Sequence, residues 1–310
     1  MIISQKLREG LRHITEREVL WNCSLAPYTS FGIGGPAEAL IEVESIAELQ
    51  RLICFVSEHD LPWRFIGRGS NLLVGDDGFG GVVFLFGKNM SGVKLLERSM
   101  TGGIRVRVSA GCSLARLLNW CVEHDCEGLE FAAGIPGSVG GAALMNAGAF
   151  GEDMSGIIEA MEVVSFANGV EELPRQQLDF DYRCWSNQGL GKAKRIVTSV
   201  DLILRRGEKT VIRKRCSDNT AKRKKNQPKI EKNAGSFFKN PPDDSAGRLI
   251  EASGLKGMRC GGAMVSLIHA NFIVNTGTAT AKDVCRLMKM VTKKVEKDSG
   301  IRLFPEVHFL

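Results

Sequence analysis

The sequence predicts a protein of the α/β or α+β class, with mixed sheets rather than a doubly wound one. A capping pair, Ser45 and Glu48, precedes apolar residues at helical spacing, and strand-like segments flank that helix on both sides. Residues 104–110 (IRVRVSA) alternate apolar and polar side chains, as in a strand with one buried face. The run 128–151 is both apolar and rich in glycine, which neither a solvated loop nor an ordinary core helix explains.

The first two thirds of the chain alternate strands and helices. Strands are expected at 38–44, 61–65, 82–86, 104–110, 161–166 and 195–205. Helices are expected after Ser45 and after Ser113, where Leu114, Leu117, Leu118 and Cys121 share one face.

The composition changes near residue 205, which predicts a domain boundary there. The segments expected beyond it are a basic helix at 208–226, a short helix at 245–252, a strand at 271–275, a helix capped by Thr280 and Asp283 and ended by Gly300, and a closing strand at 301–310.

The chain has 310 residues, enough for two or three domains with their own cores. No apolar run approaches the roughly 20 residues that span a bilayer, and the charged N-terminus lacks a signal-peptide core, so we expect a cytoplasmic protein.

The nine cysteines are scattered, without a C-x-x-C pair, and are expected to be reduced thiols that act mostly as small core residues. The five histidines have no metal-ligand spacing, so no metal site is expected.

The positive charge is concentrated in one stretch. Residues 205–232 contain twelve Lys/Arg and three Asp/Glu, a local net charge of +9, against −3 for the rest of the chain. Nucleic-acid binding is one interpretation, but between residues 183 and 237 Trp185 is the only aromatic residue, which disfavours single-strand binding. A phosphorylated small-molecule substrate and a merely solvated helix face remain open.

Two glycine motifs indicate a ligand with a diphosphate. Seven of the 24 residues in 128–151 are glycine, and Glu130 is the only charged residue among them. The turn Gly67–Asn71 (GRGSN) lies between two strand-like segments, where successive N–H groups could bind an anion. Neither motif is a G-x-G-x-x-G fingerprint or a phosphate loop, so the expected cofactor site lies outside the usual dinucleotide folds. A tightly packed turn between core elements is the alternative.

Three reactive side chains stand in apolar or turn-rich surroundings: Arg183, Ser236 and Glu306. Each also has an ordinary interpretation, as a surface guanidinium, a cap and a solvent-facing carboxylate, respectively. No G-x-S-x-G elbow is present, which disfavours a serine hydrolase.

Five motifs taken together resemble the UDP-N-acetylenolpyruvoylglucosamine reductase family. They are GRGSNLLV, GLEFAAGIPGSVGGAALMNAGAFG, Asp181-Tyr182-Arg183, NAGSFFKNP and the terminal PEV, and the resemblance runs in order from about Thr29 to Glu306. The chain looks like the shorter class, because the interval between Arg183 and Ser236 leaves no room for the extra tyrosine-bearing loop. Met264 and Leu267-Ile268 depart from the glutamine and the charged pair of the family pattern, which leaves detailed substrate contacts open.

The resemblance implies an α+β fold with an FAD-binding domain of the vanillyl-alcohol-oxidase (p-cresol methylhydroxylase, PCMH) type. The implied organisation is an FAD-binding domain over 1–204 with subdomains at about 1–70 and 71–204, a smaller α+β substrate-binding domain over 205–298, and a C-terminal strand over 299–310 that carries Glu306.

The resemblance also implies FAD as a cofactor and NADPH as a co-substrate. Because neither glycine motif contains a histidine or cysteine, the FAD is expected to be non-covalent. The implied cofactor contacts in the first motif are Gly67, Arg68, Gly69, Ser70, Asn71 and Leu72, with Gly67–Asn71 for the diphosphate. The implied flavin and ribityl contacts are Ala132, Ala133, Gly134, Ile135, Pro136, Ser138, Val139, Gly140 and Gly141.

The implied reaction reduces the enolpyruvyl group of a UDP-sugar. Arg183 and Glu306 would stabilise the enolate-like species, and Ser236 would donate the proton, with Lys239 as a group that could activate it. Tyr182, Lys224 and Asn240 are the implied substrate contacts. We expect a monomer that binds neither nucleic acid nor membrane. The rival interpretations are a nucleic-acid-binding protein and an FAD-linked oxidase of another substrate.

Overall fold

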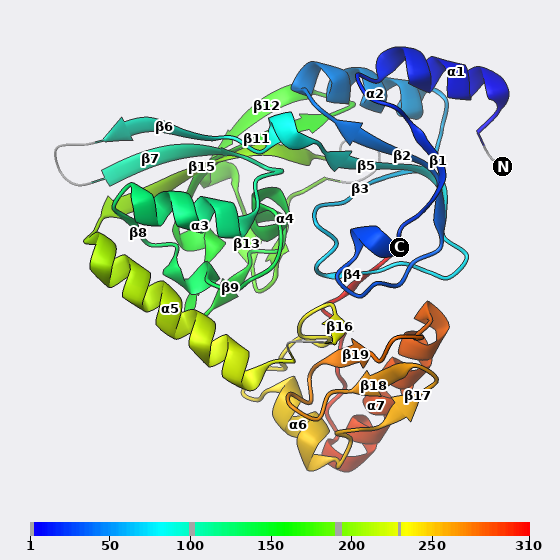
Figure 1. Cartoon of the computed structure of the whole chain (residues 1–310), viewed down its shortest axis with the longest axis vertical. Coiled ribbons are helices and arrows are strands. Elements are labelled where there is room, and N and C mark those ends of the chain that lie inside the picture. Colours follow the sequence, from blue (N-terminus) through cyan, green and yellow to red (C-terminus); the bar gives the residue numbers. More distant parts are fainter. Residues whose placement is uncertain (1–2, 99–102, 190–193, 229–230) are drawn as a thin grey trace. The chain divides into compact units, whose positions relative to one another are not determined.

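The computed structural model describes residues 3–98, 103–189, 194–228 and 231–310, and the chain forms two compact units (Figure 1). Unit one consists of Met1–Trp21, Glu38–Gly67 and Gly80–Ala221. Unit two consists of Asn22–Ala37, Arg68–Phe79 and Lys222–Leu310. Each unit is therefore assembled from three separate stretches of the sequence.

This division differs from the predicted boundary at residue 205. Residues 22–37 and 68–79 precede that boundary by more than a hundred positions, yet they belong to unit two. The physical reason is burial, because Phe31, Ile33 and Leu73 pack into the core of unit two. Composition along the chain does not reveal such a non-local core.

The first sheet has the strand order β1-β2-β5-β3. Its strands are β1 (Leu20–Ser24), β2 (Pro36–Val43), β5 (Phe79–Phe86) and β3 (Trp63–Phe65), and the helices of this region are α1 (Gln5–Ile14) and α2 (Ile46–Glu58). Helix α2 begins at the predicted cap, where the Ser45 hydroxyl accepts a hydrogen bond from the Glu48 N–H. The Glu48 side chain does not complete a capping box. Its buried carboxylate accepts from the N–H groups of Glu44 (2.7 Å) and Glu16 (2.8 Å).

The second sheet lies in unit one and has the order β12-β11-β15-β7-β6, with β8 paired to the end of β15. Its strands are β6 (Val93–Arg98), β7 (Gly103–Ser109), β8 (Cys126–Glu127), β11 (Ile158–Ser165), β12 (Gly169–Pro174) and β15 (Ile196–Arg206). The alternation predicted for β7 is confirmed, because Ile104, Val106 and Val108 are buried in the core. Helices α3 (Leu114–Glu123) and α4 (Val139–Leu144) contribute apolar residues to the same core.

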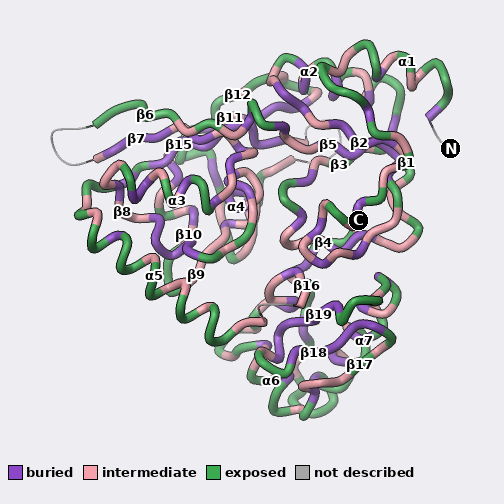
Figure 2. The backbone as a smooth tube through the Cα atoms, viewed as in Figure 1, coloured by how far each residue is buried: buried purple, intermediate pink, exposed green. Residues whose placement is uncertain are grey.

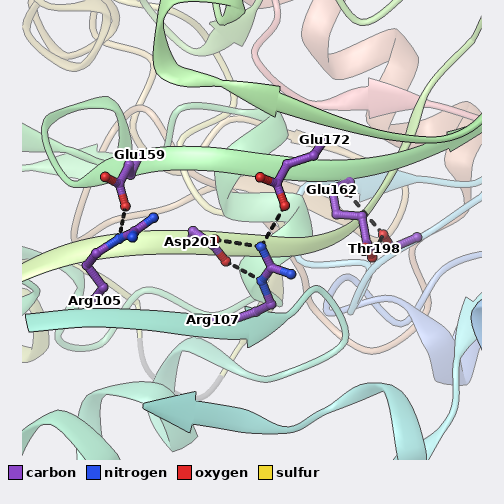
Figure 3. Close-up of polar contacts among 7 residues, drawn as sticks. All are labelled: Arg105, Arg107, Glu159, Glu162, Glu172, Thr198 and Asp201. Atoms are coloured by element: carbon purple, nitrogen blue, oxygen red, sulfur yellow. Dashed lines mark hydrogen bonds and ion pairs between the residues drawn. The ribbon is translucent and has the colours of Figure 1, made fainter. Parts of the chain in front are cut away.

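The polar side chains of the second sheet form ion pairs across its strands (Figure 3). Arg107 donates to both carboxylate oxygens of Asp201 at 2.6 and 2.7 Å, and also to Glu172 at 2.8 Å. Arg105 donates to Glu159 at 2.5 Å. The hydrogen bond to Asp201 is the main reason that the pKa of Arg107 is raised above its ordinary value. Asp201 is only 3% exposed, so loss of Arg107 would leave a buried carboxylate without a cation.

Unit two contains the sheet β16-β19-β18-β17 and the parallel strand pair β4–β20. These strands are β4 (Leu72–Leu73), β16 (Lys232–Asn233), β17 (Arg259–Cys260), β18 (Ala263–Val265), β19 (Ile273–Asn275) and β20 (His308–Phe309), and the helices are α6 (Ala246–Ala252) and α7 (Ala281–Ser299). The predicted capping box of Thr280 and Asp283 and the left-handed Gly300 (φ +71°) bound α7. The remaining long helix, α5 (Lys209–Asn226), is exposed along most of its length (Figure 2).

The predicted strand at 301–310 is wrong for most of its length. Only His308–Phe309 form a strand, and an isolated bridge joins Pro305 to Phe238. The backbone here pairs with different segments in turn, because the Phe304 carbonyl accepts from Lys239 whereas the His308 N–H donates to Asn71. Alternation of apolar residues does not reveal such changes of partner.

All nine cysteines are free, but only Cys112, Cys121 and Cys126 are buried, so the prediction that most are core residues is wrong. Burial raises the pKa of the Cys126 and Cys216 thiols to about 11.

Among the described residues, no helix is long and apolar enough to cross a membrane. In that same part of the chain, no group of three His, Cys, Asp or Glu side chains is placed to hold a metal ion.

Candidate functional site

The first glycine motif forms the predicted strand–turn–strand, between β3 and β4. Gly69 has a φ of +61°, and a Cβ there would collide with the carbonyl of Tyr28, so this position requires glycine. The Ser30 N–H donates to the Gly69 carbonyl at 3.1 Å and holds the turn. In the described part of the chain, the N–H groups of Arg68, Gly69 and Asn71 donate to no acceptor. They are therefore open to an anion.

The second glycine motif meets the first within unit one. A Cβ added at Gly67 would lie 2.6 Å from the Ser138 hydroxyl oxygen, which already accepts from the Gly141 N–H as the cap of α4. Gly140 has a different reason to be glycine. Its Cβ would lie 2.6 Å from the Cβ of Ala110, and its N–H donates to the Ala110 carbonyl. Packing against the sheet thus explains Gly140, as the alternative interpretation of this run expected.

These observations fit a cofactor that carries a diphosphate. Backbone N–H groups that face no protein acceptor are suitable donors to phosphate oxygens, and glycine lets the backbone approach them closely. The turn at 67–71 supplies both features. The segment that would contact the flavin, from Ala132 to Gly141, begins at the last residue of the 3-10 turn Glu130–Ala132. The Glu130 carboxylate accepts from the Gly128 N–H at 2.7 Å.

Arg183 occupies the turn of a hairpin in unit one. Strands β13 (Phe180–Asp181) and β14 (Cys184–Trp185) leave a two-residue turn of Tyr182 and Arg183. Arg183 has a φ of +57°, an unfavourable conformation for a residue with a side chain. Its Nη2 donates to the carbonyl of Gly148 at 3.1 Å, and its guanidinium lies 5.1 Å from the centre of the Tyr182 ring. Arg183 is therefore partly buried, and its hydrogen-bond partner Gly148 belongs to the glycine-rich run.

Ser236 and Glu306 lie on hydrogen-bonded segments of unit two. The Glu306 N–H donates to the Phe237 carbonyl at 2.9 Å, next to the bridge between Phe238 and Pro305. The side-chain amide of Asn71 donates to the Glu306 carbonyl at 3.1 Å. Three motifs that are far apart in the sequence therefore meet within one unit. Arg183 and Tyr182 belong to unit one, and their assembly with Ser236 and Glu306 into one cavity remains a prediction.

The three predicted substrate contacts have different environments. Tyr182 is 46% exposed at its hairpin turn. Lys224 is exposed in the last turn of α5. The Asn240 side-chain oxygen accepts from the N–H of Ala246 at 3.1 Å, so this residue also supports the start of α6.

The basic stretch is partly neutralised within unit one. Lys209 and Arg213 on α5 both pair with Glu123, and Arg215 pairs with Glu127 at 3.5 Å. The local excess of positive charge therefore balances acidic residues of the neighbouring 123–130 segment. This pairing disfavours the nucleic-acid interpretation of that half of the helix. Lys229, also counted in the stretch, lies outside the described residues.

One supporting residue escaped prediction from the sequence. The Asp76 carboxylate accepts from the N–H groups of Ala281 (2.7 Å) and Lys282 (3.0 Å), the first two residues of α7. It thereby fixes the segment that follows the turn at 67–71. Nothing in the local pattern around Asp76 indicates this, because its partners lie 205 and 206 positions away.

Two models of known protein families match the chain. Residues 37–172 match the model of an FAD binding domain, and residues 227–310 match the C-terminal domain of UDP-N-acetylenolpyruvoylglucosamine reductase. The UDP-N-acetylenolpyruvoylglucosamine reductases of Syntrophus aciditrophicus (strain SB) and Bacillus subtilis (strain 168) are each 40% identical to this chain, over 306 and 307 residues. Each alignment covers 98% of this chain, with 96% and 99% of the relatives, respectively.

A solved structure is also similar. The crystal structure of the UDP-N-acetylenolpyruvylglucosamine reductase from Thermus caldophilus has a TM-score of 0.77 and 38% identity, and the match covers 94% of this chain and 98% of that one. The predicted α+β fold class with an FAD-binding domain is confirmed by this similarity and by the domain match. Since relatives at 40% identity match this chain over nearly its full length, the chain belongs to the family of UDP-N-acetylenolpyruvoylglucosamine reductases.

Proposed function

We propose that this protein is an FAD-containing UDP-N-acetylmuramate dehydrogenase. It uses NADPH to reduce the enolpyruvyl group of UDP-N-acetylenolpyruvoylglucosamine, giving UDP-N-acetylmuramate for peptidoglycan synthesis. Besides the family, the observation that carries the proposal is the meeting of Asn71, the Ser236 segment and Glu306 within unit two. It brings the turn that we propose for the diphosphate and the residues that carry the hydroxyl and the carboxyl group into one region.

The chain holds the cofactor mainly through its backbone. The N–H groups of Arg68, Gly69 and Asn71 would hold the diphosphate, and the segment from Ala132 to Gly141 would border the flavin. A bound FAD would supply the hydride-transfer chemistry between NADPH and the vinyl carbon of the substrate. Neither glycine motif contains a histidine or cysteine for a covalent bond, so the FAD is dissociable.

Arg183 and Glu306 stabilise the negative charge that develops on the reduced substrate. Addition of hydride to the vinyl carbon leaves charge on the adjacent carbon and its carboxylate. A guanidinium is always cationic and has a planar fork of donors, which suits a carboxylate-like anion. The hydrogen bond from Arg183 to the Gly148 carbonyl orients that fork. Glu306, when protonated, donates a hydrogen bond to the same species.

Ser236 donates the proton that completes the reduction, and it acts as a general acid toward the carbanion carbon. A hydroxyl is a weak acid in water, so its surroundings must activate it, and the nearby Lys239 supplies a positive charge for this. Tyr182, Lys224 and Asn240 contact the UDP-sugar, with the lysine toward the diphosphate. The enzyme works as a monomer in the cytoplasm and binds neither nucleic acid nor membrane.

Two measurements on the purified protein test this function. We expect a flavin absorption spectrum, with the yellow colour released by acid, and anaerobic NADPH oxidation that depends on UDP-N-acetylenolpyruvoylglucosamine. A colourless protein that bound nucleic acid would favour the first rival interpretation. If the protein consumed NADPH or another donor only when oxygen was present, and did not need the enolpyruvyl substrate, it would be an oxidase instead.

A further inference from the structure

We infer that Asn271 is a positioning residue for the proton donor Ser236. Its buried side-chain amide fixes the two residues that directly follow the serine. The inference rests on the proposed function, since it assigns a task to Asn271 within that reaction.

Asn271 binds both backbone polar groups of Phe238. Its Oδ1 accepts from the Phe238 N–H at 2.9 Å, and its Nδ2 donates to the Phe238 carbonyl at 2.8 Å. Its own carbonyl accepts from the Phe237 N–H at 2.7 Å. With Asn271 only 3% exposed, water is largely excluded from these groups. The Asn271 side chain thus makes the hydrogen bonds to the Phe238 backbone that a neighbouring strand would otherwise make.

The same two residues are bound from their other side by the segment that carries Glu306. The Glu306 N–H donates to the Phe237 carbonyl, and Phe238 bridges Pro305. The Phe237–Phe238 pair therefore lies between Asn271 and the segment of the second proposed catalytic group. Its hydrogen bonds set how far apart Ser236 and Glu306 stand.

The residue before Ser236 does little to fix it. Gly235 has a φ of +78°, and nothing lies within 4 Å of a Cβ added there. Its N–H donates only to the Asn233 side chain, at 2.9 Å. The rings after the serine are instead fully enclosed, since Phe237 and Phe238 are 0% and 1% exposed and contact each other edge to face at 5.3 Å. Although Asn233 pairs with Val274 and Ala234 is buried further upstream, the backbone directly beside the hydroxyl is thus fixed mainly from its C-terminal side.

Asparagine suits this position because its side chain offers a donor and an acceptor on a short stem. Leucine, which has the same branched arrangement of side-chain heavy atoms, would leave the Phe238 N–H and carbonyl buried without partners. Aspartate would keep the acceptor but place a second oxygen against the Phe238 carbonyl. The Asn271 N–H itself donates to Nδ1 of His269 at 3.2 Å, which holds the residue in place.

The test is Asn271→Leu, measured in separate half-reactions by stopped flow. We expect flavin reduction by NADPH to stay within about twofold of wild type, because it needs no proton from Ser236. Reoxidation by the UDP-sugar should slow by about 100-fold, since a displacement of 1 Å at a reacting group costs about that much. The kcat should fall with little change in KM, and the solvent deuterium isotope effect should rise. Hydrogen exchange at the Phe238 amide should speed up, a readout that needs no turnover.

A double-mutant cycle distinguishes positioning from general damage. In a Ser236→Ala background, Asn271→Leu should slow reoxidation by less than about threefold, because the group that it positions is already gone. A further loss of about 100-fold there would overturn the inference. Equal reoxidation by wild type and Asn271→Leu would also overturn it, and would leave the proposed function intact.

Asn275 provides the matched control. It is also buried, its Oδ1 accepts from Gly277 and Ala279, and its Nδ2 donates to the Phe31 carbonyl. Asn275→Leu should lower thermal stability but leave the reoxidation rate within about threefold of wild type. An equal loss of rate in both variants would overturn the inference.

Should Asn271→Leu fail to fold, Asn271→Asp, which keeps the acceptor, takes its place in the cycle. A wild-type enzyme that did not consume the UDP-sugar would refute the proposed function and the inference with it.

Discussion

The side-chain amide of Asn71 donates a hydrogen bond to the backbone carbonyl of Glu306, at 3.1 Å. The two residues are 235 positions apart, and the His308 N–H donates in return to the Asn71 carbonyl at 3.0 Å. The turn proposed to bind the FAD diphosphate is thus attached directly to the backbone of the proposed catalytic carboxyl group. A change at Asn71 is therefore expected to affect both functions.

Asn71→Ala should weaken FAD binding and also slow flavin reoxidation by the UDP-sugar. Loss of one hydrogen bond of about 1 kcal/mol corresponds to about fivefold in each quantity. Titration of FAD fluorescence gives the first quantity and stopped flow gives the second. Asn168→Ala removes an exposed side-chain hydrogen bond to Glu171 and is the control, with both quantities unchanged. If Asn71→Ala altered FAD affinity alone, the coupling to Glu306 would be wrong.

Ser236→Ala should separate the two halves of the reaction. Flavin reduction by NADPH should remain, whereas reoxidation by the UDP-sugar should fall by about 10²–10³-fold, the usual effect of losing a group that acts only in the transition state. Single-turnover stopped flow under nitrogen measures both rates. Ser30→Ala in the same unit is not a suitable control, because its hydroxyl donates to the Asn233 carbonyl at 2.6 Å. Ser217→Ala, on the exposed face of α5, is suitable and should behave as wild type. Wild-type reoxidation by Ser236→Ala would refute the proton-donor role.

Arg183→Lys should slow reoxidation by about 100-fold, although the charge is kept. Lysine cannot present the planar fork of donors, and its ammonium is placed differently relative to the Gly148 carbonyl. Arg175→Lys is the matched control, since Arg175 also contacts an aromatic ring, that of Phe180, and a backbone carbonyl. The control should keep the wild-type rate. Similar rates for Arg183→Lys and wild type would show that charge alone suffices.

Local signals predicted the regular elements well. The caps Ser45, Ser113 and Thr280 each begin a helix where expected, because a cap and the apolar spacing after it are determined within a few residues. The glycine turn at 67–71 was also predicted from the sequence, since the positive φ of Gly69 disfavours residues with a side chain. The motifs that indicated the family combine local features of this kind.

Contacts between distant segments were not predictable in the same way. Glu48 matched a capping box by spacing, yet its carboxylate bonds to Glu16, 32 positions earlier. Asp76 and Asn271 have no distinctive neighbours in the sequence, although each binds backbone groups of another segment. Apolar residues at 301–310 resembled a strand, but their backbone partners change along the segment. Such pairings depend on the tertiary fold and leave no periodic signal.

Arg107→Met should destabilise the protein by about 3 kcal/mol, because it leaves the buried Asp201 carboxylate without its cation. The double variant Arg107→Met/Asp201→Val should regain most of that loss, since it removes the uncompensated charge as well. Urea unfolding gives the free energy of unfolding of each variant. Arg105→Met is the control: its partner Glu159 is more exposed, so the expected loss is below about 1 kcal/mol. Additive losses in the double variant would contradict this interpretation.

His269 predicts how stability responds to acid. Burial first, and then the charge of Lys256, lowers the pKa of His269 below its ordinary value of 6.5. Above that pH the histidine is neutral in both the folded and the unfolded chain and adds no pH dependence. As the pH falls below 6.5, the unfolded chain takes up the proton more readily, so stability should decrease until the lowered folded pKa is passed. Protonation would also remove the Nδ1 acceptor of the Asn271 N–H.

Urea unfolding at pH 7.5 and 5.5 tests this dependence. Between these two pH values, the free energy of unfolding should decrease less in His269→Phe than in wild type. His13→Gln, on the exposed face of α1, should keep the wild-type dependence. Equal losses in wild type and His269→Phe would rule out this residue as a source of the acid sensitivity.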